Sequence, residues 1–70
     1  MEGTVKFFDD RKNYGFISPD GESEDLFVHR NDIESTLLER EGSPLNEGDR
    51  VKFGTEQTEK GSKAVRVEKI

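Results

Sequence analysis

Two short segments of this chain alternate strictly between rings and small or aliphatic side chains, and this alternation limits how the chain can fold. Residues 14–17 read Tyr-Gly-Phe-Ile, and residues 26–29 read Leu-Phe-Val-His. Successive side chains of a β-strand point to opposite faces, so each segment has one ring-bearing face and one face suited to a core. We therefore expect two neighbouring strands whose shared outer face carries Tyr14, Phe16, Phe27 and His29.

A small domain that turns aromatic rings outward gives up the stability that their burial would provide, because burial of apolar surface is the main source of stability. Such a face is therefore expected to meet a ligand. Unpaired nucleic acid is the ligand class that suits such a face, since every base offers a π-face for stacking. The pattern therefore predicts a surface that binds single-stranded RNA or DNA. The rings also have a purely structural interpretation, in which cross-strand aromatic pairs steady the sheet.

Alternating segments elsewhere in the chain predict an all-β fold. The expected inward positions are Val5, Val51 and Phe53 in the first and fourth strands, and Val65 and Val67 in the last. Short strands joined mainly by tight turns favour a small closed barrel, because closure leaves no exposed sheet edge. We expect five strands, at about residues 3–8, 14–18, 25–30, 50–54 and 63–68.

Turn-forming residues separate these strands. The polar residues 9–13 are suited to closing the first hairpin, and residues 19–21, which read Pro-Asp-Gly, open the next turn. The expected last turn is formed by Gly61 and Ser62.

The stretch between the third and fourth strands is the least regular part of the chain. Asn31 is placed to cap a single helical turn that buries Ile33. Residues 35–48 lack a clear period, so we expect a long loop there, with a brief helix over residues 36–40.

Composition narrows the functional classes. The 70 residues include no cysteine and one histidine, and 29% of them are hydrophobic, so we expect one domain over residues 1–70 without disulfide, metal or cofactor. No nucleophile–base set can be named, so neither an enzyme nor a small-molecule substrate is expected. No apolar run approaches the roughly 20 residues of a membrane span, and no charged-then-apolar leader precedes the first strand. The sequence therefore predicts a monomeric cytoplasmic protein with no membrane partner.

The net charge of −5 and the pI near 4.8 are unusual for a nucleic-acid binder, whose electrostatic footprint is normally a basic patch. Residues 1–35 hold nine acidic and four basic side chains, whereas residues 36–70 hold seven of each. The densest acidic run, at residues 20–25, falls in an expected hairpin loop that can be directed away from the rings. A competing hypothesis is a protein-interaction module, because an aromatic groove with an acidic rim would suit a basic or proline-rich peptide.

Three ordered motifs carry a resemblance to a known family. They are residues 3–8 (Gly-Thr-Val-Lys-Phe-Phe), 12–17 (Lys-Asn-Tyr-Gly-Phe-Ile) and 26–29, and residues 47–53 and 60–64 follow them. In this order and spacing, the chain resembles the cold-shock domain with its two ribonucleoprotein motifs. The resemblance implies a five-stranded antiparallel OB-fold barrel that binds single-stranded RNA and DNA with weak sequence preference. It also implies an RNA chaperone that keeps strands unpaired.

Position by position, the resemblance implies a nucleic-acid-binding face. Phe7 takes the place of the family's exposed tryptophan, and Arg30 stands where the family usually has phenylalanine. Phe8 borders the face and is assigned equally to the core and to ligand contact. Basic positions suited to phosphates flank the rings. The candidate nucleic-acid-binding residues are Lys6, Phe7, Phe8, Lys12, Tyr14, Phe16, Phe27, His29, Arg30, Lys60 and Lys63.

Departures from the family pattern predict weaker binding. The family's aromatic residue in the long loop has no counterpart except Leu37 or Leu38, and Asp9 and Asp10 lie near the expected phosphate path. Asn13 replaces a glycine of the first motif, and asparagine is among the few other residues that tolerate a positive φ. We therefore expect binding led by stacking, with a shallow dependence on salt.

Overall fold

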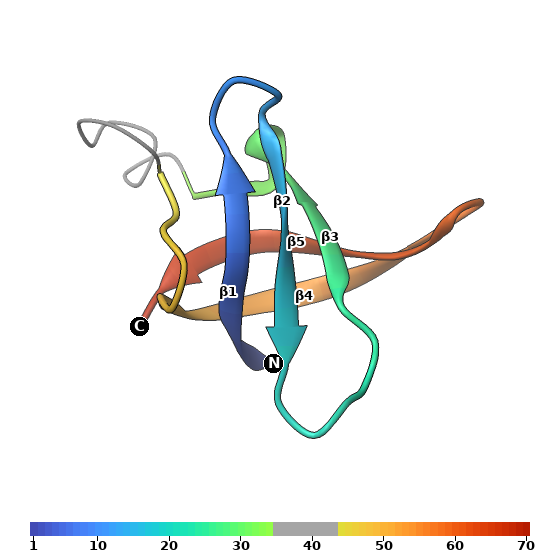
Figure 1. Cartoon of the computed structure of the whole chain (residues 1–70). Coiled ribbons are helices and arrows are strands. Elements are labelled where there is room, and N and C mark those ends of the chain that lie inside the picture. Colours follow the sequence, from blue (N-terminus) through green and yellow to red (C-terminus); the bar gives the residue numbers. More distant parts are fainter. Residues whose placement is uncertain (35–43) are drawn as a thin grey trace.

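A closed five-stranded β-barrel is seen in the computed structural model, which describes residues 1–34 and 44–70 (Figure 1). The all-β barrel of the OB-fold type expected from the sequence is therefore confirmed. The helix expected over residues 36–40, with Leu37 and Leu38, lies outside the described residues. The elements are β1 (Glu2–Asp9), β2 (Tyr14–Pro19), β3 (Leu26–His29), the 3-10 turn η1 (Arg30–Asp32), β4 (Arg50–Thr58) and β5 (Gly61–Lys69).

The strands follow one another around the barrel in the order β1-β2-β3-β5-β4, and β4 closes the barrel onto β1. In Figure 1, β1, β2 and β3 run side by side and cross β4 and β5, whose hairpin extends beyond the barrel. The ladders are antiparallel except between β3 and β5, where Phe27 pairs with Lys63 in parallel. This parallel contact brings β5 beside the ring-bearing strands.

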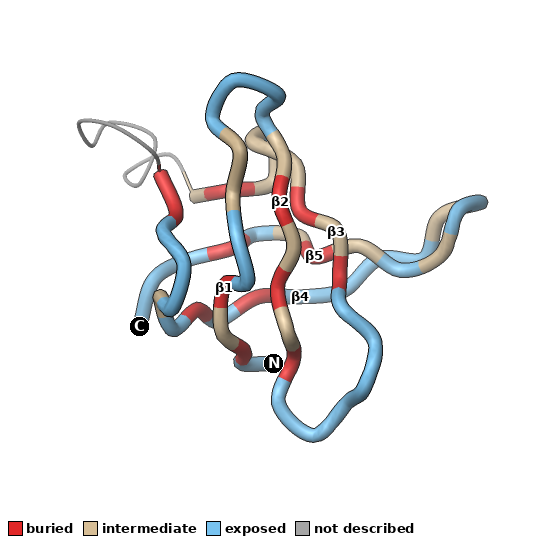
Figure 2. The backbone as a smooth tube through the Cα atoms, in the orientation of Figure 1, coloured by how far each residue is buried: buried red, intermediate tan, exposed pale blue. Residues whose placement is uncertain are grey.

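The core is built from the inward positions of the strands, as the alternation of buried and half-buried residues along β2 and β3 shows (Figure 2). Leu45, only 1% exposed, joins this core from the connection before β4, a position for which the sequence has no periodic signal. The buried hydrophobic residues are Val5, Ile17, Leu26, Val28, Ile33, Leu45, Val51, Phe53, Ala64 and Val67.

A β-bulge in β1 separates two residues that a regular strand would place on one face. Val5 pairs with Ile17 and Phe7 pairs with Phe16, so two steps along β1 match one step along β2, with Lys6 as the extra residue. Such an insertion reverses the side-chain alternation beyond it. Val5 is therefore buried at 1% exposure, whereas Phe7 is turned outward at 43%.

The inward position expected for Val65 is wrong, because β5 contains a second bulge. Lys52 pairs with Glu68 and Gly54 pairs with Val65, so β5 holds one residue more than β4 between these pairs. Arg66 has a φ of 52°, a left-handed conformation that interrupts the pleat. The shift leaves Val67 inward, as expected, but buries Ala64 in place of Val65, which is only half-buried.

The last turn lies earlier than expected. β4 continues to Thr58, the turn is formed by Glu59 and Lys60, and Gly61 already begins β5 with a φ of 119°. The Thr58 hydroxyl donates to the Gly61 carbonyl at 2.6 Å and so closes the turn. The expected turn at Gly61 and Ser62 is therefore wrong by two residues.

An arginine on β4 links three segments at the end of the barrel that lies opposite this hairpin. The Arg50 guanidinium donates to both carboxylate oxygens of Asp20, at 2.9 and 2.6 Å, and to the Thr4 hydroxyl at 2.8 Å. Planar bidentate pairs of this kind are the stronger surface ion pairs. The clamp joins β1, β4 and the start of the β2–β3 loop.

Gly15 is predicted to be intolerant of any side chain. It pairs with Phe8, and an added Cβ would collide with the Phe7 carbonyl oxygen and lie 2.7 Å from the Phe8 Cα. We expect Gly15→Ala to lower the free energy of unfolding by about 3 kcal/mol, the upper end of the usual cost of overpacking. Gly54→Ala is the matched control, because its Cβ would lie at ordinary contact distances, 3.4 Å from the Val65 side chain and 3.8 Å from the Val65 carbonyl oxygen. Equal urea-unfolding midpoints for the two variants would contradict this account.

Asp20 is predicted to make stability acid-dependent. The Arg50 hydrogen bond holds the pKa of the Asp20 carboxyl below its ordinary value of 3.8. A carboxyl with a lowered folded-state pKa stabilises fully above the ordinary value and loses that contribution as pH falls through the folded one. Urea titrations of wild type and Asp20→Asn should therefore show a constant stability difference near neutral pH that closes below pH 3.8. A difference that survives unchanged in strong acid would refute the assignment.

Candidate nucleic-acid interface

Three strands place one ring each in a single transverse row. Phe7 of β1 lies opposite Phe16 of β2, and Phe16 lies opposite Phe27 of β3. Phe27 is paired in turn with Lys63 of β5, so the row ends in a cation. Without the bulge at Lys6, Phe7 would not join this row.

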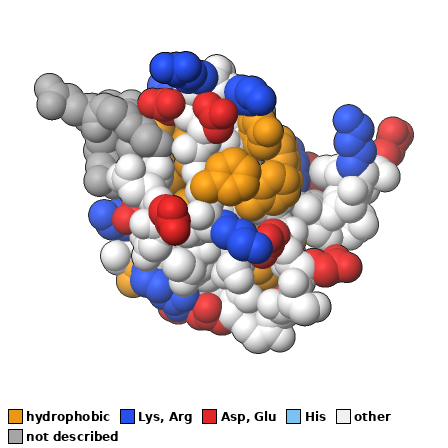
Figure 3. Space-filling view, in the orientation of Figure 1, with side chains coloured by type: hydrophobic (Ala, Val, Ile, Leu, Met, Phe, Trp, Pro, Cys, Tyr) orange, Lys and Arg blue, Asp and Glu red, His pale blue; other side chains and the backbone are white. Residues whose placement is uncertain are grey.

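The rings of this row and Tyr14 form one cluster, which we call the four-ring cluster (Phe7, Tyr14, Phe16 and Phe27). Phe16 contacts Phe7 and Phe27 with ring centroids 5.6 and 5.9 Å apart. Tyr14 stacks on Phe27 at 5.6 Å with an interplanar angle of 26°. Figure 3 shows the hydrophobic side chains gathered on one face, with charged groups around them. Mutual packing keeps three of these rings half-buried, and Phe7 remains exposed.

Phe8 points to the other side of β1. Its half-buried ring packs against the core cluster, so the structure separates it from the four-ring cluster. Of the two assignments left open by the sequence, the core is the one that this packing favours.

An open groove continues the ring surface toward the β4–β5 hairpin. It has a volume of about 380 Å³ and is lined by Phe16 and Phe27 on one side and by Thr58 and residues 60–63 on the other. Apolar area therefore borders two lysine side chains, Lys60 and Lys63, in one concavity. A flat aromatic base fits such a surface better than a compact polar ligand does.

His29 stabilises the backbone beside the rings, and it takes the capping role expected for Asn31. It pairs with Tyr14 across β2 and β3, and its Nδ1 accepts a hydrogen bond from the Asn31 backbone N–H at 3.1 Å. His29, not Asn31, is thus the N-cap of η1, because the turn begins two residues earlier than the sequence indicates. Ile33 is buried behind it, as expected.

Two of the candidate phosphate-binding lysines are held by carboxylates. Lys6 Nζ lies 2.8 Å from Asp25 Oδ2, and Lys63 Nζ lies 3.3 Å from Asp32 Oδ2. Asp25 ends the acidic loop, so this carboxylate of the loop reaches a candidate phosphate-binding lysine. Neither pair is predictable from the sequence, since 19 and 31 positions separate their members and no local pattern marks them.

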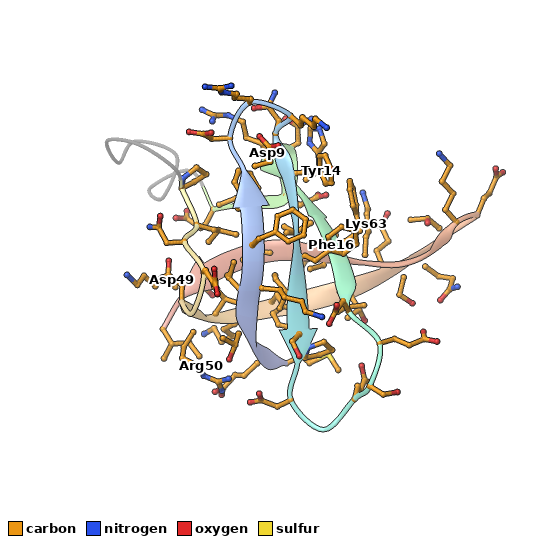
Figure 4. The ribbon with its side chains drawn as sticks, in the orientation of Figure 1. Asp9, Tyr14, Phe16, Asp49, Arg50 and Lys63 are labelled. Atoms are coloured by element: carbon orange, nitrogen blue, oxygen red, sulfur yellow. The ribbon has the colours of Figure 1, made fainter. Side chains whose placement is uncertain are left out.

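The remaining candidate cations lie at the ends of the ring surface. Lys12 is exposed in the β1–β2 turn and Lys60 is exposed in the β4–β5 turn. Arg30 begins η1, and its backbone N–H donates to the Asn13 carbonyl at 2.8 Å, so η1 is tied to the first turn. Figure 4 shows Lys63 on the side of Tyr14 and Phe16, while Arg50 lies toward the other end of the barrel.

Asp9 has a local structural task in the turn. Its carboxylate accepts the backbone N–H groups of Arg11 and Lys12, at 2.9 and 3.2 Å. Asn13 closes the same turn with a φ of 63°, the positive value that its place in the motif requires. The Asp9 carboxylate therefore has its hydrogen-bond partners within its own turn.

The described residues 1–34 and 44–70 hold neither a candidate metal centre nor a membrane-spanning helix. Among these residues, no three His, Cys, Asp or Glu side chains are grouped so that they could hold a metal ion. No helix in the described part of the chain has the length and apolarity to cross a membrane.

Comparisons with known proteins agree on one family. The profile of the "'Cold-shock' DNA-binding domain" matches residues 1–70. "Cold shock protein CapA" of Pseudomonas fragi is 47% identical over 64 residues, covering 91% of this chain and 94% of that protein. The "Major cold shock protein" of Micrococcus luteus is 43% identical over 68 residues, with 97% and 96% covered. "Cold shock-like protein CspG" of Escherichia coli K12 is 43% identical over 67 residues, with 96% and 90% covered.

The cap at His29 predicts a selective stability effect. His29→Ala removes the acceptor of the Asn31 N–H and should lower the free energy of unfolding by about 1 kcal/mol, as for other lost caps. His29→Asn should keep most of that stability, because an asparagine oxygen can accept the N–H two residues further on. Urea unfolding of the three proteins at neutral pH measures both effects. An equal loss in both variants would show that the cap contributes nothing.

Proposed function

The chain belongs to the cold-shock DNA-binding domain family, a family of nucleic-acid-binding proteins, and from that premise we propose that its four-ring cluster binds single-stranded RNA and DNA by base stacking. The observation that supports this proposal is the alignment of Phe7, Phe16 and Phe27 in one row across three strands. Tyr14 widens the row, and the half-buried His29 stands beside it. We propose binding and not catalysis, by a single domain over residues 1–70 that acts as a cytoplasmic monomer.

Stacking is strong enough to carry this binding without a basic patch. Each base stacked on an aromatic side chain contributes about 1–3 kcal/mol, as measured by alanine substitution. Acidic groups remote from the rings act weakly at physiological salt, where the Debye length is about 8 Å. Because Lys6 and Lys63 are already paired with carboxylates, few phosphates gain a counter-charge. Affinity should therefore fall only slowly with salt.

The same surface explains how the protein would act on RNA. Bases must be unpaired before a ring can stack on them, so each bound strand is withdrawn from base pairing by mass action. No energy source is needed for this exchange. We propose that the protein is an RNA chaperone of this passive kind. Stacking alone does not read the 2′-hydroxyl, so RNA and DNA should bind with similar affinity.

Removal of one ring is predicted to weaken oligonucleotide binding. Phe16→Ala and Phe27→Ala should each raise the Kd for fluorescein-labelled heptathymidine roughly 5- to 150-fold, the equivalent of 1–3 kcal/mol. Fluorescence anisotropy at low and moderate salt measures the Kd, and thermal unfolding confirms that each variant is folded. Phe8→Leu serves as the control, since it changes a ring of similar size on the core side of β1.

The outcomes separate this proposal from its rival. Binding that is weakened roughly fivefold or more in the two ring variants, retained in Phe8→Leu and only mildly salt-dependent would support the stacking surface. The proposal would be overturned if the folded wild type bound neither heptathymidine nor an oligouridine of equal length. If the same protein then bound a lysine-rich or proline-rich peptide through Phe16 and Phe27, the peptide-binding module would be the better account.

A further inference from the structure

Lys63 occupies the position in the ring row where a phosphate contact is expected. It follows Phe7, Phe16 and Phe27 in register across the barrel, and it lines the groove beside Phe16 and Phe27. A base stacked on Phe27 would lie beside Lys63, which lines the same groove. A lysine there would normally attract the phosphate as a point charge.

The ammonium group of Lys63 is already engaged by Asp32. The Oδ2 atom of Asp32 lies 3.3 Å from Nζ, and the residues that follow Asp32 are bound to β5. Ile33 is buried and forms a parallel bridge with Val67, and the Glu34 N–H donates to the Val67 carbonyl at 2.7 Å. The Asp32 carboxylate is thereby positioned against β5 by the fold itself, beside the end of the ring row.

The pair is also shielded from water more than a typical surface pair. Its side chains are 29% and 21% exposed, whereas those of Lys52 and Glu68, another ion pair of the barrel, are 60% and 50% exposed. Partial burial reduces dielectric and salt screening, so the attraction persists at physiological ionic strength. A phosphate that approached Lys63 would have to displace Asp32 or accept its repulsion.

We propose that Asp32 is a specificity-determining residue that withholds Lys63 from phosphates, so that strands are bound through their bases and not through their backbones. The inference rests on the function proposed above and adds which part of the strand is recognised. A duplex offers phosphates but no unpaired base, and the neutralised end of the row gives it no counter-charge. The protein would thus reject duplexes and other polyanions despite the lysines along its ring surface.

Release of Lys63 tests this directly. Asp32→Asn keeps the size of the side chain and removes its charge, and it should tighten heptathymidine binding about three- to tenfold at low salt. One additional phosphate neutralised should steepen the plot of log affinity against log salt by about 0.7. The preference for heptathymidine over a blunt duplex should narrow in the same variant. Thermal unfolding checks that the fold is kept.

Two control variants distinguish the ion pair from a general change of charge. Glu68→Gln makes the same charge change at the far end of β5, and it should alter affinity less than twofold. Lys63→Gln alone leaves the Asp32 carboxylate without its counter-charge beside the ring row, so it should weaken heptathymidine binding at low salt. In the double variant, Asp32→Asn with Lys63→Gln, the gain in affinity should vanish, which a double-mutant cycle quantifies.

The outcomes distinguish failure of the role of Asp32 from failure of the proposed function. If wild type binds heptathymidine and Asp32→Asn behaves like Glu68→Gln, the role of Asp32 is refuted while the stacking surface stands. A gain that persists in the double variant also refutes it, since the effect would not pass through Lys63. If neither wild type nor Asp32→Asn binds the oligonucleotide, the proposed function and this inference both fail.

Discussion

The extra residue at Lys6 is the constraint on which the ring surface depends. In a regular strand Val5 and Phe7 would point to the same face, and β1 would have to give up either a core side chain or a ring. The bulge lets β1 supply both, because the alternation reverses between them. Gly15 makes the neighbouring contact possible, since any side chain there would collide with the β1 backbone beyond the bulge. The surface is therefore a product of backbone register before it is a product of side-chain chemistry.

Charge pairing explains how an acidic protein can carry a nucleic-acid interface. The net charge of −5 would disfavour binding if recognition relied on phosphates. Here two of the candidate cations, Lys6 and Lys63, each face a carboxylate, so the electrostatic part of binding is reduced. What remains is an apolar, ring-lined surface, and we propose that its affinity comes from stacking. Such a surface distinguishes unpaired from paired strands more sharply than a basic surface would.

Polar side chains next to the rings hold the backbone on which the rings are mounted. His29 caps η1 through Nδ1, and Asp9 accepts two N–H groups of the first turn. Both residues therefore stabilise the turns beside the rings. If a variant of His29 or Asp9 loses binding, its stability must also be measured, because the substitution could act through the fold. Phe16 and Phe27 differ in this respect, since the alternation of their strands places them on the face opposite the core.

The sequence alone determined the barrel and most of its core, because strict alternation over short strands allows few other folds. It also determined which rings share an outer face on β2 and β3, since those strands are regular. Only the tertiary structure decided the two bulges, which reversed the alternation at Phe7 and moved the inward position from Val65 to Ala64. It alone also decided the partner of Lys63, because residues far apart along the chain meet only once the barrel has closed. Local patterns record which face a side chain prefers, whereas register and charge pairing arise from how the strands fit one another.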